Sequence, residues 1–429
     1  MIQTNQATPY SITGKIVHCR LPVLFSIQLH EPAMKYVVLI LFTAYTLVTS
    51  AETERISFYE QSLTIDGESY LIRLPRGYQL QLLSRSLSQP RMLTFLPNKD
   101  LLAGSRSGNI YRLSPPYTSA SILLKLDDYP HSVAYYDNYL YIAQTHGLYK
   151  VRYTPGQASI KRSDIRLLAA LPTGGHSSRT VKKGPDNRIY LSIGISGNCS
   201  DEYLHESYNF DARRGGIFLL DESRPTARLI PFASGLRNPV GFDWHPESKT
   251  MYASNNGPDH QGFHQPPEYF SEVTYGSFHG MPWYQFNGKH IRKDSCASSP
   301  PPLPASKVTL PVATFAARNA PMDVHFIDKN TMDKRFRHNA IIALRGSWGT
   351  ISHGNFAQKK ASRREPKLVM VHFSEKHKLI VSDLLSGFQL RNGDRWARPV
   401  GIASGPDGDL YFTSDSGISG LFRLHKLNR

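Results

Sequence analysis

A short phrase recurs along this chain, and it constrains the fold more than any other feature of the sequence. Each copy begins with turn residues such as Pro, Asp, Asn or Gly, continues with a short apolar run, and ends with small polar residues and a Gly. Five clear copies and one weaker copy occupy residues 96–108, 135–147, 184–194, 245–257, 405–417 and, in the weaker case, 336–346. Turn residues that lead into an alternating apolar strand are typical of β-hairpins. Because the hairpins recur every few tens of residues, we predict an all-β fold, a six-bladed β-propeller of four-stranded antiparallel blades.

The composition agrees with such a fold. The 429 residues are 40% hydrophobic, which allows a sizeable core, and the 23 Tyr and 20 Phe suit half-buried strands. Repeat folds of this length commonly form one domain. We therefore expect residues 52–429 to form a single propeller domain.

The N-terminal segment differs from the rest of the chain. Residues 34–51 contain one Lys, then an apolar run, then small residues, which is the layout of a secretory signal peptide with cleavage after Ala51. We expect residues 1–33 to be a non-native upstream extension. The alternative is an N-terminal membrane anchor, although the apolar run is short for a membrane span. The signal predicts a periplasmic or secreted protein without a stable membrane anchor after cleavage.

The chain is basic, with a formal net charge of +16. The basic residues are scattered along the sequence instead of forming one arm or helix, so we expect no nucleic-acid partner. A solvated basic surface, or a few arginines that serve a polyanionic ligand, explains the charge better.

Two cysteines follow the predicted signal, Cys199 and Cys296. An oxidising compartment would permit a disulfide between them. The other reading is two separate small residues, because the sequence does not show that they meet. No Cys/His spacing resembles a zinc or haem site.

Polar residues with catalytic or binding chemistry gather near the expected strand ends. His176 lies in a Gly/Ser-rich stretch before a strand, and histidine is the usual proton acceptor in catalysis; the alternative is a histidine that closes a turn. Arg237 and Asn238 precede Pro239, which favours an extended backbone at Asn238. Arg237 could bind a ligand carboxylate through two hydrogen bonds, or pair with a carboxylate between blades.

Three further segments add to this set. The turn at 255–259 offers backbone carbonyls and an Asp, the oxygen donors that Ca²⁺ prefers. Arg345 lies at the expected strand end of the copy at 336–346. Arg398 lies shortly before the copy at 405–417 and directly before a Pro. Arginines at corresponding positions of several blades would point toward one axial pocket.

Taken together, these segments resemble the PQQ (pyrroloquinoline quinone)-dependent soluble sugar dehydrogenases, the glucose/sorbosone dehydrogenase family. The resemblance covers roughly residues 70–425. It is carried by the motifs GHSSRTVKKGPDNRIYLSIG (175–194), GLRNPVGFDWHPESKTMYASNNGPD (235–259) and RPVGIASGPDGDLYFTSDSG (398–417), with PPE at 266–268.

The resemblance implies a propeller that binds PQQ across its axis and oxidises a sugar or sugar aldehyde, passing electrons to an external acceptor. His176 would be the general base. The residues expected beside the cofactor are Arg237, Asn238, Arg345 and Arg398. Gly257 and Pro258 would offer the carbonyl ligands of a Ca²⁺ ion.

The chain also departs from the family pattern. Gly175 stands where some relatives have an Asp before the catalytic histidine, and Arg345 and Arg318 stand where relatives have histidines. His260 and His264 replace part of an acidic run after the Asn-Gly turn. These changes keep open the alternative of a catalytically silent extracellular propeller that binds a ligand or protein. A further alternative is a Ca²⁺-dependent lactonase, although that chemistry would want acidic or amide side chains at an axial metal where this chain has arginines.

Overall fold

A computed structural model describes residues 56–200, 214–224, 226–346, 363–373 and 379–427. The chain divides into two compact units, Met1–Glu52 and Thr53–Arg429, and all described residues lie in the second. The predictions for residues 1–33 and 34–51 therefore fall outside the described residues. Within the described ranges, no helix is long and apolar enough to cross a membrane.

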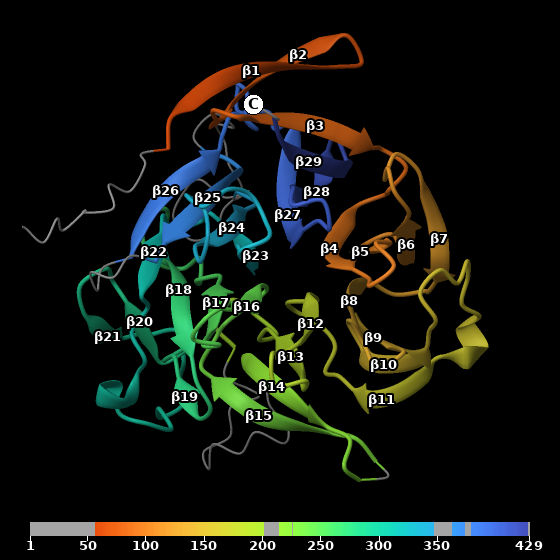
Figure 1. Cartoon of the computed structure of the whole chain (residues 1–429). Helices are drawn as coiled ribbons and strands as arrows, with labels where there is room; N and C mark the ends of the chain where they lie inside the picture. The colour runs from red at the N-terminus through yellow and green to blue at the C-terminus, as the bar shows by residue number, and fades with distance from the viewer. Residues whose placement is uncertain (1–55, 201–213, 225, 347–362, 374–378, 428–429) are drawn as a thin grey trace, which may run out of the picture. The chain divides into compact units, whose positions relative to one another are not determined.

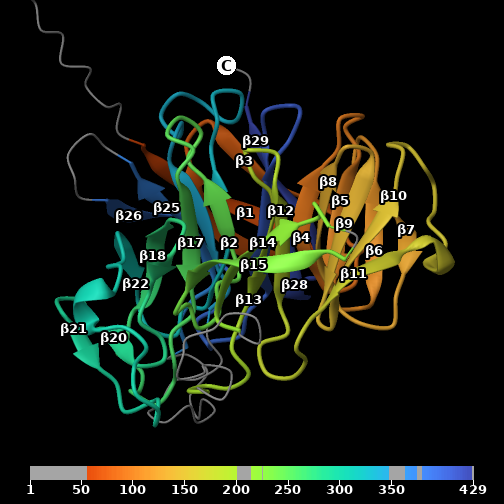
Figure 2. The same cartoon turned by 90° about the horizontal axis from the view of Figure 1, so that it is seen from below.

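The second unit contains six blades of four antiparallel strands each, which follow one another around a ring (Figures 1 and 2). The first three blades are β4–β7 (Pro90–Phe95, Leu101–Ser105, Asn109–Leu113, Ala120–Lys125), β8–β11 (Pro130–Tyr136, Tyr139–Gln144, Gly147–Arg152, Arg166–Ala170) and β12–β15 (Arg179–Lys183, Ile189–Ile193, Gly216–Asp221, Arg228–Ser234).

The second half of the ring has the same order. The fourth and fifth blades are β16, β17, β18 and β22 (Phe242–Trp244, Met251–Asn255, Glu268–Val273, Ala313–Phe315) and β23–β26 (Pro321–Phe326, Ala340–Leu344, Lys367–His372, Ile380–Leu385). The sixth blade consists of β27, β28, β29 and β3 (Ala397–Ser404, Leu410–Gly417, Gly420–Lys426, Tyr78–Ser84). The prediction of a six-bladed propeller is confirmed.

Each copy of the recurring phrase supplies the second strand of a blade together with the turn before it. The six strands are β5, β9, β13, β17, β24 and β28. Most of their apolar residues are buried on both faces, because neighbouring blades cover each sheet; all five residues of β24, for example, are buried. The phrase is thus the part of every blade that the core constrains most strongly.

The ring is closed by a strand from the N-terminal side of the unit. β3 pairs with β29, and Leu80 lies opposite Leu424. A preceding hairpin of β1 (Phe58–Ile65) and β2 (Glu68–Pro75) packs on this closure, since Gln61 exchanges two hydrogen bonds of 2.8 Å with the backbone of Leu80. The first and last parts of the propeller therefore stabilise each other.

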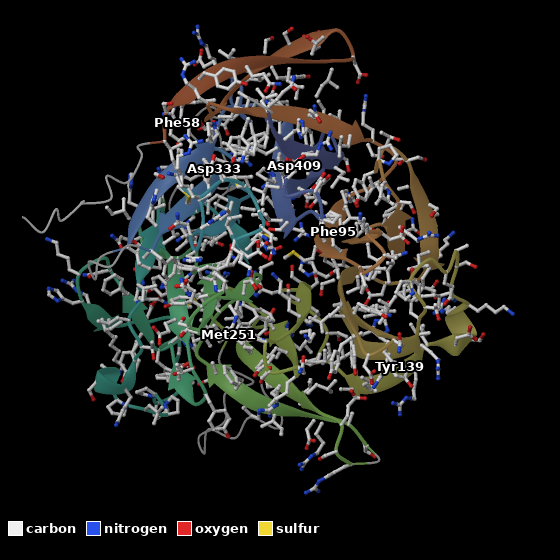
Figure 3. All side chains as sticks on the ribbon, in the orientation of Figure 1. Phe58, Phe95, Tyr139, Met251, Asp333 and Asp409 are labelled. Carbon is white, nitrogen blue, oxygen red and sulfur yellow. A yellow bond between two sulfur atoms is a disulfide. The ribbon has the colours of Figure 1, made fainter. Side chains whose placement is uncertain are left out.

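Apolar side chains pack between adjacent blades, as in the cluster shared by the first and sixth blades. Figure 3 draws the side chains on the ribbon and labels Phe95. Phe95 of the first blade packs edge-on against Tyr411 of the sixth, with ring centroids 5.2 Å apart. A short strand, β19 (Ser277–Phe278), adds to the third blade as a fifth strand and runs parallel to β15. Outside the blades, the described residues also form a hairpin of β20 (Tyr284–Phe286) and β21 (Ile291–Lys293) and two 3₁₀ turns (Arg162–Asp164, Ala305–Lys307).

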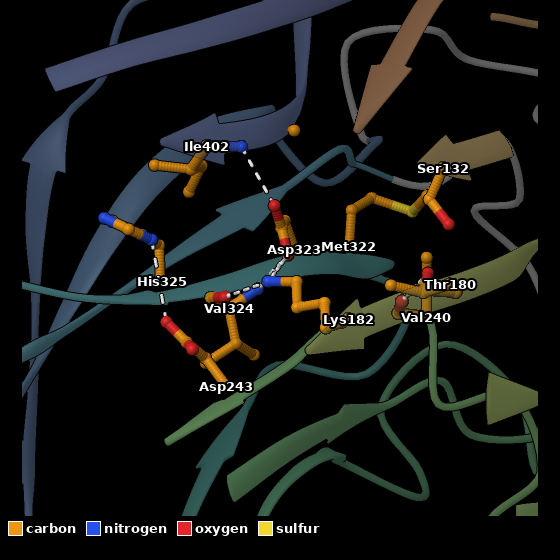
Figure 4. A network of polar contacts seen from close by, with 12 residues as sticks. Ser132, Thr180, Lys182, Val240, Asp243, Met322, Asp323, Val324, His325 and Ile402 are labelled. Carbon is orange, nitrogen blue, oxygen red and sulfur yellow. Dashed lines mark hydrogen bonds and ion pairs between the residues drawn. The ribbon is translucent and has the colours of Figure 1, made fainter. Parts of the chain in front are cut away.

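A polar network joins the first strands of several blades (Figure 4). Lys182 on β12 donates to the Asp323 carboxylate on β23 at 2.9 Å, and the backbone N–H of Ile402 on β27 donates to the same carboxylate at 3.0 Å. Burial alone would lower the pKa of Lys182, but the carboxylates of Asp323 and Asp243 outweigh it and raise that pKa. The Asp323 carboxylate therefore joins three blades, two through the ion pair and the third through the backbone of Ile402.

Candidate functional site

The predicted site residues lie at one end of the blades. In each blade the first strand is antiparallel to the second, so the start of one lies beside the end of the other; Arg179 lies opposite Ile193, and Ala397 opposite Gly417. His176 precedes β12, and Arg237 and Asn238 precede β16. Arg345 follows β24, and Arg398 is the second residue of β27.

Contacts between neighbouring blades connect these strand ends. The Ile195 N–H donates to the Arg237 carbonyl at 2.8 Å, and the Asn256 side chain donates to the Pro321 carbonyl at 2.8 Å. Further along the ring, Arg398 donates to the carbonyl of Arg345 at 3.0 Å. The sequence-predicted residues thus belong to one continuous set of loops.

His176 is held through one ring nitrogen. Its Nδ1 lies 2.6 Å from the backbone carbonyl oxygen of Ile195. Because a carbonyl only accepts, Nδ1 carries the hydrogen in this tautomer and Nε2 keeps its lone pair. Burial first, and then the positive charge of Arg237, lower the pKa of His176 to about 3. Among the described residues, no group hydrogen-bonds to Nε2, so this nitrogen is the one that can accept a proton.

Two buried arginines brace the histidine loop, and sequence reasoning missed both. Arg179 donates to the carbonyls of Pro172 at 2.8 Å and of His176. Arg214 donates to the carbonyls of Gly174 and Gly194, each at 2.8 Å. Nothing in the sequence distinguishes these arginines from exposed ones, because their partners are backbone carbonyls.

The backbone geometry at Gly175 explains why a glycine stands before His176. The φ of Gly175, 64°, is in the left-handed region, and a Cβ at this position would collide with the backbone of Ser196. A side chain is therefore excluded here, and the Ile195 carbonyl orients the imidazole in its place.

Arg237 and Asn238 lie beside the histidine. The Arg237 guanidinium is buried and donates to the Asn198 carbonyl at 2.8 Å and to the Asn198 side-chain oxygen at 2.9 Å. Burial is the main reason that the pKa of Arg237 is lowered to about 10. A Cβ at Gly194 would meet both the Asn238 amide oxygen and the His176 side chain, so this glycine lets the two residues approach.

A second group of cations surrounds Asp415. Arg345 donates from Nε to this carboxylate at 3.0 Å, and the buried Arg91 forms an ion pair with it. Arg398 donates to the backbone carbonyls of Arg345 and Gly346. These carbonyls are uncharged, so Arg398 adds a positive charge to the group without bringing a carboxylate of its own. Burial, and then the positive charges of Arg345 and Arg395, lower the pKa of Arg398.

The three guanidiniums around the Asp415 carboxylate leave a surplus of positive charge, which suits a ligand with several carboxylates. Arg91 and Asp415 were not predicted as site residues.

The donors near Gly257 and Pro258 fit a protein-held Ca²⁺ poorly. The Glu268 carboxylate accepts the backbone N–H groups of Gly257 and Arg318, and burial raises its pKa. The Asp259 carboxylate is paired with the Arg318 guanidinium. Both acids are therefore engaged by donors of the chain, whereas Ca²⁺ takes six to eight oxygen ligands. The carbonyls of Gly257 and Pro258 remain predicted ligands, and most of any Ca²⁺ shell would have to come from cofactor and water.

The structure answers the question that the sequence left open about the cysteines. Cys199 and Cys296 form a disulfide, with Cα atoms 5.0 Å apart. Asn198, the neighbour of Cys199, is the residue that binds the Arg237 guanidinium. The disulfide therefore fixes the loop behind the predicted site.

Comparisons with known proteins agree with this fold. Residues 72–265 match the family model described as TrAA12-like. A protein of Borreliella burgdorferi described as uncharacterised is 27% identical over 388 residues, which are 86% of this chain and 95% of the relative.

Solved structures share the propeller at low sequence identity. The PQQ domain of pyranose dehydrogenase from Coprinopsis cinerea, in its holo form, has a TM-score of 0.64 and 19% identity, and covers 83% of this chain and 97% of its own. The calcium structure of a family AA12 enzyme from Trichoderma reesei has a TM-score of 0.66 and 18% identity, with 88% and 99% covered.

A bacterial structure extends the comparison. The soluble aldose sugar dehydrogenase from Escherichia coli, in its apo form, has a TM-score of 0.58 and 16% identity, with 81% and 99% covered. The TrAA12-like match over residues 72–265 and these neighbours confirm the resemblance that the motifs indicated, to the PQQ-dependent soluble sugar dehydrogenases.

Proposed function

We propose that this chain is a PQQ-dependent dehydrogenase that oxidises a sugar or sugar aldehyde. The observation that carries the proposal is the tautomer of His176, whose Nδ1–H is donated to Ile195 while Nε2 is left to accept a proton. When bound, PQQ would supply the acceptor for the substrate's hydride. The protein supplies the base and the charges that hold the cofactor.

His176 takes the proton of the substrate hydroxyl on Nε2. A base works best when its pKa is near the working pH, and the pKa of about 3 is far below it. Part of that lowering comes from the charge of Arg237. A carboxylate bound beside Arg237 would compensate this charge, so we expect cofactor binding to raise the pKa of His176 and make it a stronger base.

The arginines hold the carboxylates of the cofactor. Arg345 and Arg398 contribute the surplus positive charge around Asp415, and Arg237 contributes a buried guanidinium on the histidine side. Asn238 lies next to His176 and offers an amide to the cofactor or substrate. No step of the reaction is assigned to Ca²⁺, because the acids near Gly257 and Pro258 are already engaged.

The proposed setting is the periplasm or the extracellular space, with residues 34–51 as a signal peptide that is removed after Ala51. The substrate is a small sugar-like molecule, and the reduced cofactor passes its electrons to an external acceptor. The disulfide is compatible with an oxidising compartment.

The second candidate is a catalytically silent propeller that binds a ligand or protein. The ion pair of Arg318 with Asp259 favours it, because an arginine in this pair offers neither a proton acceptor nor a free carboxylate for chemistry. Both candidates use the same cations, so only turnover separates them.

The decisive experiment measures PQQ binding and dye reduction separately. PQQ is titrated into the purified protein, and dye reduction is then followed with a panel of aldoses and sugar aldehydes. We expect His176→Ala and His176→Gln to bind PQQ and to lose turnover. Binding without turnover in the unsubstituted protein would favour the silent propeller, and no binding of PQQ would refute the dehydrogenase.

A further inference from the structure

The disulfide between Cys199 and Cys296 lies against the ring of His260, and the disulfide itself does not explain how this ring is oriented. Nδ1 of His260 is 3.3 Å from Sγ of Cys199 and 3.7 Å from Sγ of Cys296. The three donor atoms all lie within 4.8 Å of one another. The sulfurs of a disulfide carry no hydrogen, so neither can donate to the ring nitrogen.

The other ring nitrogen fixes the tautomer. Nε2 of His260 lies 2.7 Å from a carboxylate oxygen of Asp294, whose side chain is 2% exposed. The same carboxylate accepts the Cys296 N–H at 3.0 Å and the side-chain amide of Gln261 at 2.8 Å. In the tautomer with its hydrogen on Nε2, the ring donates that hydrogen to this carboxylate, and Nδ1 presents its lone pair toward the two sulfurs.

We propose that the reduced chain binds Zn²⁺ through Cys199, Cys296 and His260, with Asp294 orienting the histidine from outside the coordination sphere. A metal-bound histidine typically donates its other N–H to a carboxylate, as His260 does. Zinc sites with three protein ligands keep a fourth position for water. The inference does not depend on the proposed dehydrogenase function.

The distances suit tetrahedral zinc. Bonds of about 2.3 Å to sulfur and about 2.0 Å to nitrogen separate neighbouring nitrogen and sulfur ligands by roughly 3.5 Å in a tetrahedron. The His260 nitrogen already lies 3.3 and 3.7 Å from the two sulfurs. Only the sulfurs have to move apart, to roughly 3.8 Å.

The chemistry balances with a dithiol as reductant. The dithiol gives two electrons and two protons to the Cys199–Cys296 bond, which breaks into two thiols, and the dithiol becomes a cyclic disulfide. Zn²⁺ then replaces the two thiol protons, which are released to water. Two thiolates neutralise the charge of the ion.

The same centre would keep the predicted active site in place after reduction. Asn198 precedes Cys199 and binds both the Arg237 guanidinium and the Asp259 N–H, and Asp259 precedes His260. A zinc ion that joins Cys199 to His260 and Cys296 would hold this loop as the disulfide does.

The test uses Co²⁺ as a spectroscopic substitute for zinc in the full chain. The background carries Cys19→Ser so that only two thiols can form, and the dithiol is removed without oxygen before metal is added. We expect one equivalent of Co²⁺ with a thiolate charge-transfer band in the reduced protein, displacement by Zn²⁺, and no band in the oxidised protein. Near-ultraviolet circular dichroism of the reduced protein checks that it stays folded.

Variants assign the ligands. We expect Cys199→Ser to abolish the charge-transfer band, and His260→Ala and Asp294→Asn to weaken Co²⁺ binding, the latter about 10- to 100-fold. The exposed neighbour His264, substituted by Ala, is the matched control and should leave binding unchanged. Zn²⁺ should also raise the melting temperature of the reduced protein. A folded, reduced protein that binds no Co²⁺, or that binds it equally well as His260→Ala, would overturn the proposal.

Discussion

The backbone carbonyl of Ile195 accepts the Nδ1–H of His176 at 2.6 Å, and this single bond determines which nitrogen can act as a base. Gly175 excludes a side chain directly before the histidine, because its backbone passes too close to Ser196. A main-chain acceptor cannot be protonated at ordinary pH, so the tautomer does not depend on a second titrating group.

The first prediction concerns the pH dependence of turnover. The pKa of His176, lowered to about 3, keeps the imidazole neutral throughout the mildly acidic range. Although a bound carboxylate raises this pKa, we expect the acidic limb of kcat/KM to lie well below pH 6.5. Steady-state dye reduction between pH 4 and 8 measures the limb. A limb at the usual histidine value would mean that the base is solvated and not held as in this structure.

The second prediction concerns stability without cofactor. The folded pKa of His176 is below the value of 6.5 for a free histidine, so the unfolded chain binds one more proton between about pH 3 and 6.5. The contribution of His176 to stability is therefore complete above pH 6.5 and is lost as the pH falls. We expect the His176→Gln protein to show a shallower decline, by up to about 1.4 kcal/mol per pH unit. Urea unfolding from pH 4 to 7.5 measures the slopes, and His264→Gln should retain the original slope.

Much of this fold could be predicted from the sequence, because its information is local. Each copy of the phrase contains a turn and a doubly buried strand, so the repeat predicted the second strand of all six blades. The closure of the ring could not be found in this way, since β3 pairs with a strand more than 300 residues later.

The candidate site was predictable where a motif carried it and not where spatial partners decide. The motifs pointed to His176, Arg237 and Asn238, and the structure brings these three residues together, while their roles stay predictions. Arg179 and Arg214 were missed because they bind main-chain carbonyls, which leave no sequence signal. The disulfide, left open by the sequence, depends on two loops that meet only in the folded chain.

The third prediction concerns the cations around Asp415. Replacing Arg398 by Gln removes one charge from the surplus, and we expect the affinity for PQQ to fall by about 10- to 100-fold, or about 1.4–2.8 kcal/mol, typical of a charge-assisted contact. Arg398→Lys, which keeps the charge, should retain part of the affinity. Fluorescence titration with PQQ measures both, and Arg188→Gln at an exposed position is the control. An unchanged affinity in Arg398→Gln would remove this arginine from the site.

The fourth prediction concerns Ca²⁺. Replacing Arg318 by Ala releases the Asp259 carboxylate from its ion pair. We expect this variant to bind Ca²⁺ or Tb³⁺ at least tenfold more tightly than the unsubstituted protein, because a free carboxylate is a good ligand for both ions. Tb³⁺ luminescence with Ca²⁺ competition measures the difference. Adding Asp259→Asn should remove the gain, and tight Ca²⁺ binding by the unsubstituted protein would contradict the competition between Arg318 and the metal.

The last prediction concerns the ion pair of the Asp323 carboxylate, which joins three blades. Asp323 is buried and is bound by Lys182 and by the backbone of Ile402. Asp323→Leu alone leaves the half-buried Lys182 ammonium without its carboxylate partner, with only the Val324 carbonyl at 3.1 Å. Breaking a buried pair typically costs about 3–5 kcal/mol, whereas replacing both charges by apolar groups costs much less. We therefore expect Lys182→Met to restore much of the stability lost in Asp323→Leu. Denaturant unfolding of the two single variants and the double variant gives the coupling. Additive losses would show that the two charges stabilise the propeller independently, and that the pair does not hold the first strands of the blades together.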